Sequence, residues 1–177
     1  FLNLWFLGWV VGDAAFIGLT LVCAFPLLIF TLANYPLGKI FAGDLGAYLY
    51  AAIVGFLTVH FFGLHTELSA WNAVLIFFYP VAELVYSVIR KVASKQSPFQ
   101  PDQYHLHIKL YHIFLQGTGR PLLANNLVTV MLAIFWLSPA ILLPWVYTSH
   151  LLLGISIVFL SVSYLLFNLV IPKLTKK

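Results

Sequence analysis

The stretch LLLGISIVFLSVSYLLFNLVI, residues Leu151–Ile171, decides the fold class, because its 21 residues include no charged side chain. An α-helix rises about 1.5 Å per residue, so roughly 20 apolar residues cross the ~30 Å hydrocarbon core of a bilayer. The stretch therefore predicts a helix that spans a membrane.

Similar runs occur along the rest of the chain. The composition agrees, since 62% of the 177 residues are apolar and 8% are charged, whereas soluble domains carry about 25% charged residues. We predict an all-α fold, a polytopic transmembrane helical bundle that forms a single membrane domain over residues 1–177. Its five full spans, preceded by a truncated one at Phe1–Val11, are expected at Ala14–Ala33, Leu45–Phe62, Trp71–Ile89, Asn125–Leu143 and Leu151–Ile171.

The nine basic residues gather in three parts of the chain: after the first span, between the third and fourth spans, and after the fifth. Alternating spans put these three parts on one side of the membrane, and the positive-inside rule makes that side cytoplasmic. We therefore expect any chemistry at the cytoplasmic surface. The same residues are too dispersed to follow a phosphate backbone, so no nucleic acid partner is expected. In chain order they are Lys39, Arg90, Lys91, Lys95, Lys109, Arg120, Lys173, Lys176 and Lys177.

Asp44 is the acidic candidate in the connection between the first two spans, where the second span begins. One interpretation is a helix N-cap, a position that favours Asp. The other is a Mg²⁺ ligand, because Mg²⁺ is typically held by one or two carboxylates together with substrate phosphates and water. Lys39 is a candidate for neutralising a phosphate. Phe41 either offers a flat face to a nucleobase or anchors the chain at the membrane interface.

His105 and His107 form an H-x-H pair between the third and fourth spans. Residues two apart point to different sides of an α-helix, so they meet at one ligand only where the backbone is extended or turned. Zinc is a weak alternative, because it needs a third and usually a fourth ligand. We predict a short interfacial helix that begins near Gln103, with Asp102 as its N-cap. Its apolar face would hold Leu106, Leu110 and Ile113, and its polar face His105, Lys109 and His112.

Glu83 is an ionisable residue inside the predicted third span. Such a residue is a functional candidate by default. It also shares a helix face with Arg90, seven residues later, and lies close to backbone that Pro80 loosens. A structural role is favoured, and a direct catalytic role stays open.

Two blocks of the sequence resemble the motifs of one family of membrane enzymes. The first is GKIFAGDLGAY at Gly38–Tyr48, and the second runs from YPVAE at Tyr79–Glu83 to PDQYHLH at Pro101–His107. In both, the chain resembles the polyprenyl-phosphate N-acetylhexosamine-1-phosphate transferases of glycosyltransferase family 4. These bacterial enzymes start the lipid intermediates of O-antigen lipopolysaccharide, enterobacterial common antigen and cell-wall peptidoglycan. Leu45 departs from the Gly-Asp-Gly-Gly run of many O-antigen members.

The resemblance implies a role for individual residues. Asp44 matches the aspartate that binds Mg²⁺, and Phe41 matches an aromatic residue implicated in nucleobase stacking. Asn34 matches, more loosely, an asparagine of the uridine site, while His105 and His107 match histidines that contact the diphosphate. The implied catalytic residues are therefore Asp44, His105 and His107, with Asp44 as the metal ligand, and the substrate-binding residues are Asn34, Lys39, Phe41 and Lys109. Lys109 stands where family members usually carry a more basic tail.

The implied reaction transfers an N-acetylhexosamine 1-phosphate from a UDP-sugar to undecaprenyl phosphate or another polyprenyl phosphate, releases UMP, and uses Mg²⁺ as cofactor. The expected partners are a UDP-N-acetylhexosamine, a polyprenyl phosphate lipid and the membrane, and homodimerisation stays open. The expected location is the bacterial inner membrane, with the active face and the C-terminus cytoplasmic.

Members of this family have about ten spans, each of roughly 20 residues, and carry a pair of adjacent aspartates before the two motif blocks. In this sequence no two acidic residues are adjacent. We therefore expect the C-terminal half of such a transferase, inactive when isolated. The alternative function is non-enzymatic: a membrane half-transporter, or a domain that binds a phosphorylated lipid.

Overall fold

The computed structural model describes residues 1–95, 97 and 104–174, and every regular element in this part of the chain is a helix. The predicted all-α class is therefore confirmed. In chain order the helices are α1 (Leu2–Val11), α2 (Ala14–Asn34), α3 (Gly43–Leu64), α4 (Trp71–Ile76), α5 (Phe78–Ala93), α6 (Leu106–Thr118), α7 (Pro121–Trp136), α8 (Ser138–Val146) and α9 (His150–Leu174).

Four segments of the described chain are long and apolar enough to cross a membrane. They are α2, α3, α7 together with α8 (Pro121–Val146), and α9 over His150–Ile171. Four of the five predicted full spans are thereby confirmed. The stretch at the start of the chain forms the shorter apolar helix α1, which turns at Gly12, where φ is 73°, and packs against α2.

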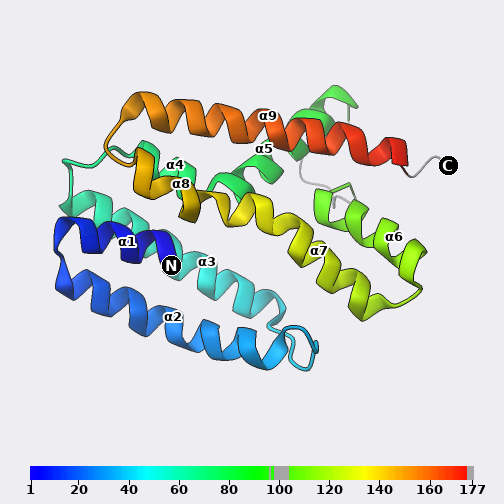
Figure 1. Ribbon diagram of the computed structural model, residues 1–177, viewed down its shortest axis with the longest axis horizontal. Coiled ribbons are helices and arrows are strands. Elements are labelled where there is room, and N and C mark those ends of the chain that lie inside the picture. The colour runs from blue at the N-terminus through cyan, green and yellow to red at the C-terminus, as the bar shows by residue number, and fades with distance from the viewer. Residues whose placement is uncertain (96, 98–103, 175–177) are drawn as a thin grey trace.

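The predicted third span, Trp71–Ile89, is wrong as a single helix. It is divided between α4 and α5, with a break at Phe77, and is not among the spanning segments. Pro80 supplies the physical reason: it has no N–H to bond to the carbonyl of Ile76, and its ring clashes there with a continuous helix. Figure 1 shows that α4 and α5, taken in succession, still run from one end of the bundle to the other.

The connections of the bundle sort into two ends (Figure 1). The α2–α3 connection, the last turns of α5, α6, the α6–α7 turn and the last turn of α9 lie at one end, and the α1–α2, α3–α4 and α8–α9 turns lie at the other. The first group carries Lys39, Arg90, Lys91, Lys109 and Arg120, and we call it the basic end. The predicted grouping of the basic connections is therefore confirmed.

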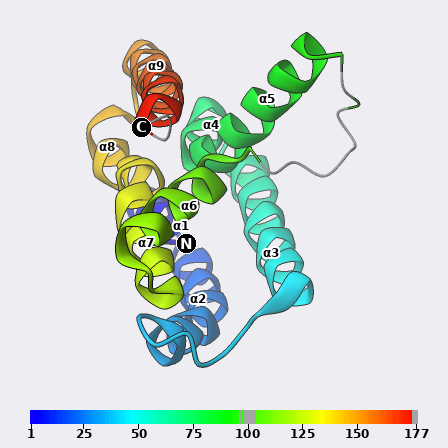
Figure 2. The ribbon, with the colours of Figure 1, turned by 90° about the vertical axis from the view of Figure 1, so that its right-hand side faces the viewer.

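Viewed onto the basic end, α6 lies beside α7, and the α2–α3 connection lies next to the first turn of α7, while α5 diverges from the other helices (Figure 2). Beneath them, Leu106 and Leu110 of α6 are almost fully buried. Tyr164 of α9 packs edge-on against Phe135 of α7, with ring centroids 5.6 Å apart. This packing fixes α6 and α7 as the wall on which the candidate site is built.

At the opposite end, Asp13 joins two helical hairpins. It is the N-cap of α2, where its Oδ1 accepts a hydrogen bond from the Phe16 N–H at 2.9 Å. Its Oδ2 lies 3.1 Å from Nε2 of His65, the residue that ends α3. The Phe16 N–H and then His65 hold the pKa of Asp13 below its ordinary value.

We expect Asp13→Ala to lower the thermal stability of the protein in detergent micelles at neutral pH, with a pH dependence that follows from the lowered pKa. A carboxyl whose folded pKa is depressed stabilises the fold above its unfolded pKa of about 3.9, and this contribution is lost as the pH falls through the folded pKa. Melting curves recorded from pH 7 to pH 3 check this. A difference from the wild type that stays constant down to pH 3 would refute the assignment, and Asp44→Ala serves as the control, because Asp44 is exposed.

Candidate active site

A cleft of ≈ 930 Å³ opens at the basic end. Its walls come from the α2–α3 connection, α5, α6 and α7, so both motif blocks contribute to it. Among the predicted site residues, Phe41 from the first block, Asn34 shortly before that block and His107 from the second block line this cleft. The remaining lining residues are Gly38, Ile40, Tyr79, Ile108, Tyr111, Pro121, Leu122, Asn125, Val128, Thr129, Leu132 and Trp136.

The α2–α3 connection is held in place from both sides. Asn34 accepts a hydrogen bond from the Ile40 N–H on its Oδ1 at 3.3 Å, which folds the loop back on the end of α2. Asn126 of α7 donates from Nδ2 to the Pro36 carbonyl at 2.9 Å. Gly38 has a φ of 62° and lies so near α7 that a Cβ there would be 3.0 Å from Cδ1 of Leu122. The loop is therefore docked on α7 and presents Phe41, whose side chain is 91% exposed.

Asp44 is the second residue of α3, which begins at Gly43 with Ala42 as its N-cap. The N-cap interpretation of Asp44 is therefore wrong. Its exposed carboxylate lies in the first turn, at the positive end of the helix dipole. Lys39 is exposed in the preceding loop. Lys39 belongs to the same connection as Phe41, and Asp44 follows this connection directly on α3, although neither residue lines the cleft itself.

The donor set for a metal at Asp44 is small. Within the described residues, no group of three His, Cys, Asp or Glu side chains is placed to hold a metal ion. A single carboxylate fits Mg²⁺ only when substrate phosphates, water or further protein ligands complete the coordination shell. The same finding gives no support, over the described part of the chain, to the zinc alternative for the histidine pair.

His105 and His107 lie where the chain enters α6. His105 is the N-cap residue, with an extended backbone at φ −59° and ψ 147°, and His107 is in the first turn of the helix. The extended backbone brings the two imidazole rings into a stack, with centroids 5.6 Å apart and planes 11° apart. Nδ1 of His105 lies 2.9 Å from Oε2 of Glu83 on α5. His107 faces the cleft, so the pair connects a buried carboxylate to the cleft wall.

The predicted amphipathic helix is confirmed as α6, with Leu106 and Leu110 buried and Ile113 packed on the core. It begins at Leu106 in the structure rather than near Gln103. The predicted cap Asp102, like Gln103, lies outside the described residues.

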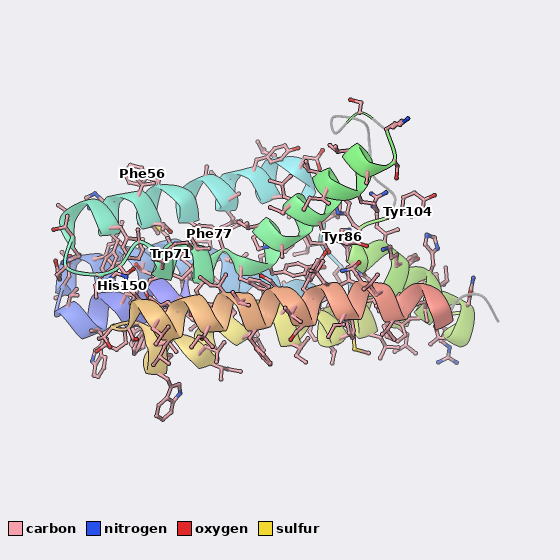
Figure 3. All side chains as sticks on the ribbon, turned by 90° about the horizontal axis from the view of Figure 1, so that it is seen from above. Phe56, Trp71, Phe77, Tyr86, Tyr104 and His150 are labelled. Atoms are coloured by element: carbon pink, nitrogen blue, oxygen red, sulfur yellow. The ribbon has the colours of Figure 1, made fainter. Side chains whose placement is uncertain are left out.

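Lys109 is directed away from the cleft. Its Nζ donates to Oδ1 of Asn168 on α9 at 3.2 Å and lies 5.5 Å from the ring centroid of Tyr86 on α5. Figure 3 shows Tyr86 and Tyr104 at this end of the molecule, whereas Trp71 and His150 mark the other end. Lys109 therefore joins α6 to α5 and α9, and its predicted contact with substrate is untested.

The cleft contains polar residues that the sequence analysis did not single out. Tyr79 belongs to the YPVAE segment, and Tyr111 lies one turn after His107. Asn125 and Thr129 are four residues apart on α7 and share one helix face in an otherwise apolar span. That spacing of polar residues inside a span was the signal available for finding them.

The surroundings of His107 lower its pKa. Desolvation at the cleft wall lowers the pKa below its ordinary value of 6.5, the negative charge of Glu83 opposes this, and the neighbouring His105 adds to it. Because the pKa lies below 6.5, neutral imidazole predominates at pH 7, so the ring can donate one hydrogen bond and accept another.

Comparison with known proteins agrees with the motif blocks. The chain is 33% identical over 97 residues to "Undecaprenyl-phosphate alpha-N-acetylglucosaminyl 1-phosphate transferase" of Thermotoga maritima. This matched region covers 55% of this chain and 31% of that protein. The chain is also 28% identical over 102 residues to "Probable undecaprenyl-phosphate N-acetylglucosaminyl 1-phosphate transferase" of Bacillus subtilis. That matched region covers 56% of this chain and 28% of that protein.

The matched region thus spans about three tenths of the length of these relatives. No protein-family model and no solved structure matches the chain. Over about half of its length, the chain is similar to undecaprenyl-phosphate N-acetylglucosaminyl 1-phosphate transferases, the family that its motif blocks resemble.

Proposed function

We propose that this chain forms part of a membrane transferase that moves an N-acetylhexosamine 1-phosphate from a UDP-sugar to undecaprenyl phosphate, with release of UMP. The observation that carries the proposal is the single cleft that Phe41 of the first block and the nearby Asn34 share with His107 of the second block. The names of the relatives support a polyprenyl phosphate acceptor and an N-acetylglucosaminyl 1-phosphate as the transferred group.

The shape of the cleft supports a lipid acceptor. Along α7 it extends from Leu122 to Trp136, a distance of about 21 Å at the rise of an α-helix. Asn34, His107 and Asn125 provide polar groups toward the basic end, and Val128, Leu132 and Trp136 provide apolar surface farther along. A ligand with a phosphate head and an isoprenoid tail matches this gradient from polar to apolar.

The proposed roles follow from these positions. Phe41 stacks on the uracil and Asn34 lines the nucleoside pocket. His107, oriented with His105, donates to the diphosphate, and Lys39 contributes positive charge close by. Asp44 would supply one ligand to Mg²⁺, which neutralises phosphate charge when bound. Because phosphoryl transfer depends mainly on positioning and charge stabilisation, such contacts are sufficient for a catalytic contribution.

The complete enzyme would need ligands for Mg²⁺ besides Asp44, because Mg²⁺ is usually held by one or two carboxylates together with substrate phosphates and water, and no two acids are adjacent in this sequence. We propose that the chain acts as the C-terminal half of that enzyme and shows no transfer when expressed alone. In this proposal the basic end faces the cytoplasm of a bacterial inner membrane, as the positive-inside rule requires.

The test is a transfer assay with the complete enzyme that carries this sequence. The enzyme is incubated with UDP-N-acetylglucosamine labelled in the sugar, undecaprenyl phosphate and Mg²⁺. We expect label in the lipid fraction and an equal amount of UMP, both abolished by a chelator. Binding of the phosphorylated lipid without Mg²⁺-dependent binding of UDP would overturn the proposal in favour of the half-transporter or lipid-binding alternative.

We expect Phe41→Ala to raise the KM for the UDP-sugar about tenfold, since base–aromatic stacking is worth roughly 1–3 kcal/mol per base. Thermal stability should not change, because the Phe41 side chain is 91% exposed. Phe56→Ala is the matched control: Phe56 is 67% exposed on α3, nearer the opposite end (Figure 3). Equal KM values for Phe41→Ala and the wild type would exclude the stacking role.

A further inference from the structure

Within the described residues, the N-cap residue of helix α6 does not cap the helix with its own side chain. Its N-cap residue, His105, makes no side-chain hydrogen bond to the helix backbone, and the first N–H groups of a helix have no partner within it. Glu83 of α5 supplies a partner for one of these groups, because its Oε1 accepts a hydrogen bond from the Leu106 N–H at 3.2 Å. The negative side chain also lies at the positive end of the α6 dipole, where a carboxylate is stabilising.

The same carboxylate orients the first histidine. Oε2 of Glu83 lies 2.9 Å from Nδ1 of His105, and the Tyr79 hydroxyl donates to Oε1 at 3.1 Å. Because a carboxylate accepts hydrogen bonds, the geometry assigns the proton to Nδ1 of His105 and turns Nε2 away from Glu83. Glu83 is only 8% exposed, so removing it would leave buried donors without an acceptor.

His105 is connected to the cleft through its stacked contact with the ring of His107. The two imidazoles lie nearly parallel with centroids 5.6 Å apart, and His107 lines the cleft. We propose that Glu83 is a positioning residue, which sets the start of α6 and the orientation of His105 and thereby presents His107 to the substrate diphosphate. This inference rests on the proposed transferase function.

A double-mutant cycle between Glu83→Gln and His105→Ala tests the inference in the complete enzyme. Glutamine keeps the size of Glu83 and an acceptor oxygen for Leu106, but loses the charge and turns an NH₂ group toward His105. We expect Glu83→Gln alone to lower kcat roughly ten- to hundredfold, the range found when the orienting partner of a metal-bound histidine is lost. The KM for the UDP-sugar should change little, because Phe41 and Asn34 are untouched.

In the His105→Ala background, adding Glu83→Gln should cause no further loss of kcat, since residues that act through one another are not additive. Multiplicative losses would mean that Glu83 does not act through His105, and would overturn the inference. If Glu83→Gln fails to fold, Tyr79→Phe takes its place in the same cycle, because it removes one of the donors that fix the carboxylate.

Glu67→Gln is the matched control, an acid-to-amide change at an exposed residue that pairs with His65 on the α3–α4 connection. It should keep the kcat of the wild type. If the wild type and this control show no transfer, the proposed function has failed. If both transfer normally and the cycle is multiplicative, only the positioning role has failed.

Discussion

Asp44→Asn in the complete enzyme is expected to lower kcat by roughly a thousandfold, the size of effect seen when one preorganised electrostatic contact is removed. The substitution keeps the shape of the side chain and removes the charge that would bind Mg²⁺. Asp44 is exposed in the first turn of α3, so the fold has no need of its carboxylate. Initial rates of UMP release, measured over a range of Mg²⁺ concentrations, check this prediction.

The amount of Asp44→Asn protein in the membrane fraction and its melting temperature should equal those of the wild type. Glu67→Gln, which neutralises an acid on the α3–α4 connection, is again the control and should retain the wild-type rate. A near-normal rate for Asp44→Asn would remove Asp44 from the proposed metal site. A lost rate that high Mg²⁺ restores would support a role in binding the ion.

His107→Ala is expected to lower kcat about a hundredfold, because it removes the imidazole that lines the cleft and faces the proposed diphosphate position. The rate of the wild type should also change with pH below 6.5, since desolvation keeps the pKa of His107 under its ordinary value. That inflection should be absent from the pH profile of His107→Ala. Steady-state rates between pH 5 and pH 8 measure both effects.

His60→Ala is the matched control for this variant. His60 is exposed on α3, outside the cleft, and stacks on Phe56 with ring centroids 5.9 Å apart. Its removal should leave both kcat and the pH profile unchanged. Equal losses in the two histidine variants would show a general effect on the membrane domain and contradict the role of His107.

Hydropathy predicted most of the fold because a bilayer imposes a strong and local requirement. Each spanning helix must be apolar over its whole length, and α2, α3, α7 with α8, and α9 meet that requirement. The third span was wrongly predicted as one helix because average hydropathy does not detect a missing hydrogen bond. Pro80 interrupts the backbone ladder without lowering the apolar content around it, so the single predicted helix became α4 and α5.

Part of the site was predictable because some of its residues belong to local sequence motifs. The motif blocks pointed to Phe41 and His107, and the looser match just before the first block pointed to Asn34. The structure places all three on one cleft. The contact between Glu83 and the start of α6 joins residues 22 and 23 positions apart across a connection, and no local periodicity reports it.

Lys109 shows the same limit of sequence patterns. The helical pattern assigned it to the polar face of α6, whereas in the structure its amino group reaches Asn168 on α9 rather than the cleft. A helical pattern predicts which face a residue occupies, whereas tertiary packing decides what that face meets.

The central claim, that both motif blocks form one nucleotide-sugar site, is tested most directly by photoaffinity labelling. The complete enzyme is irradiated with Mg²⁺ and a UDP-N-acetylglucosamine analogue that carries an azide on the uracil ring, and the labelled peptides are identified by mass spectrometry. We predict adducts in the α2–α3 connection around Phe41 and on the facing wall of α6 and α7, all suppressed by excess UDP. Adducts confined to other helices, or labelling that UDP does not suppress, would contradict the claim.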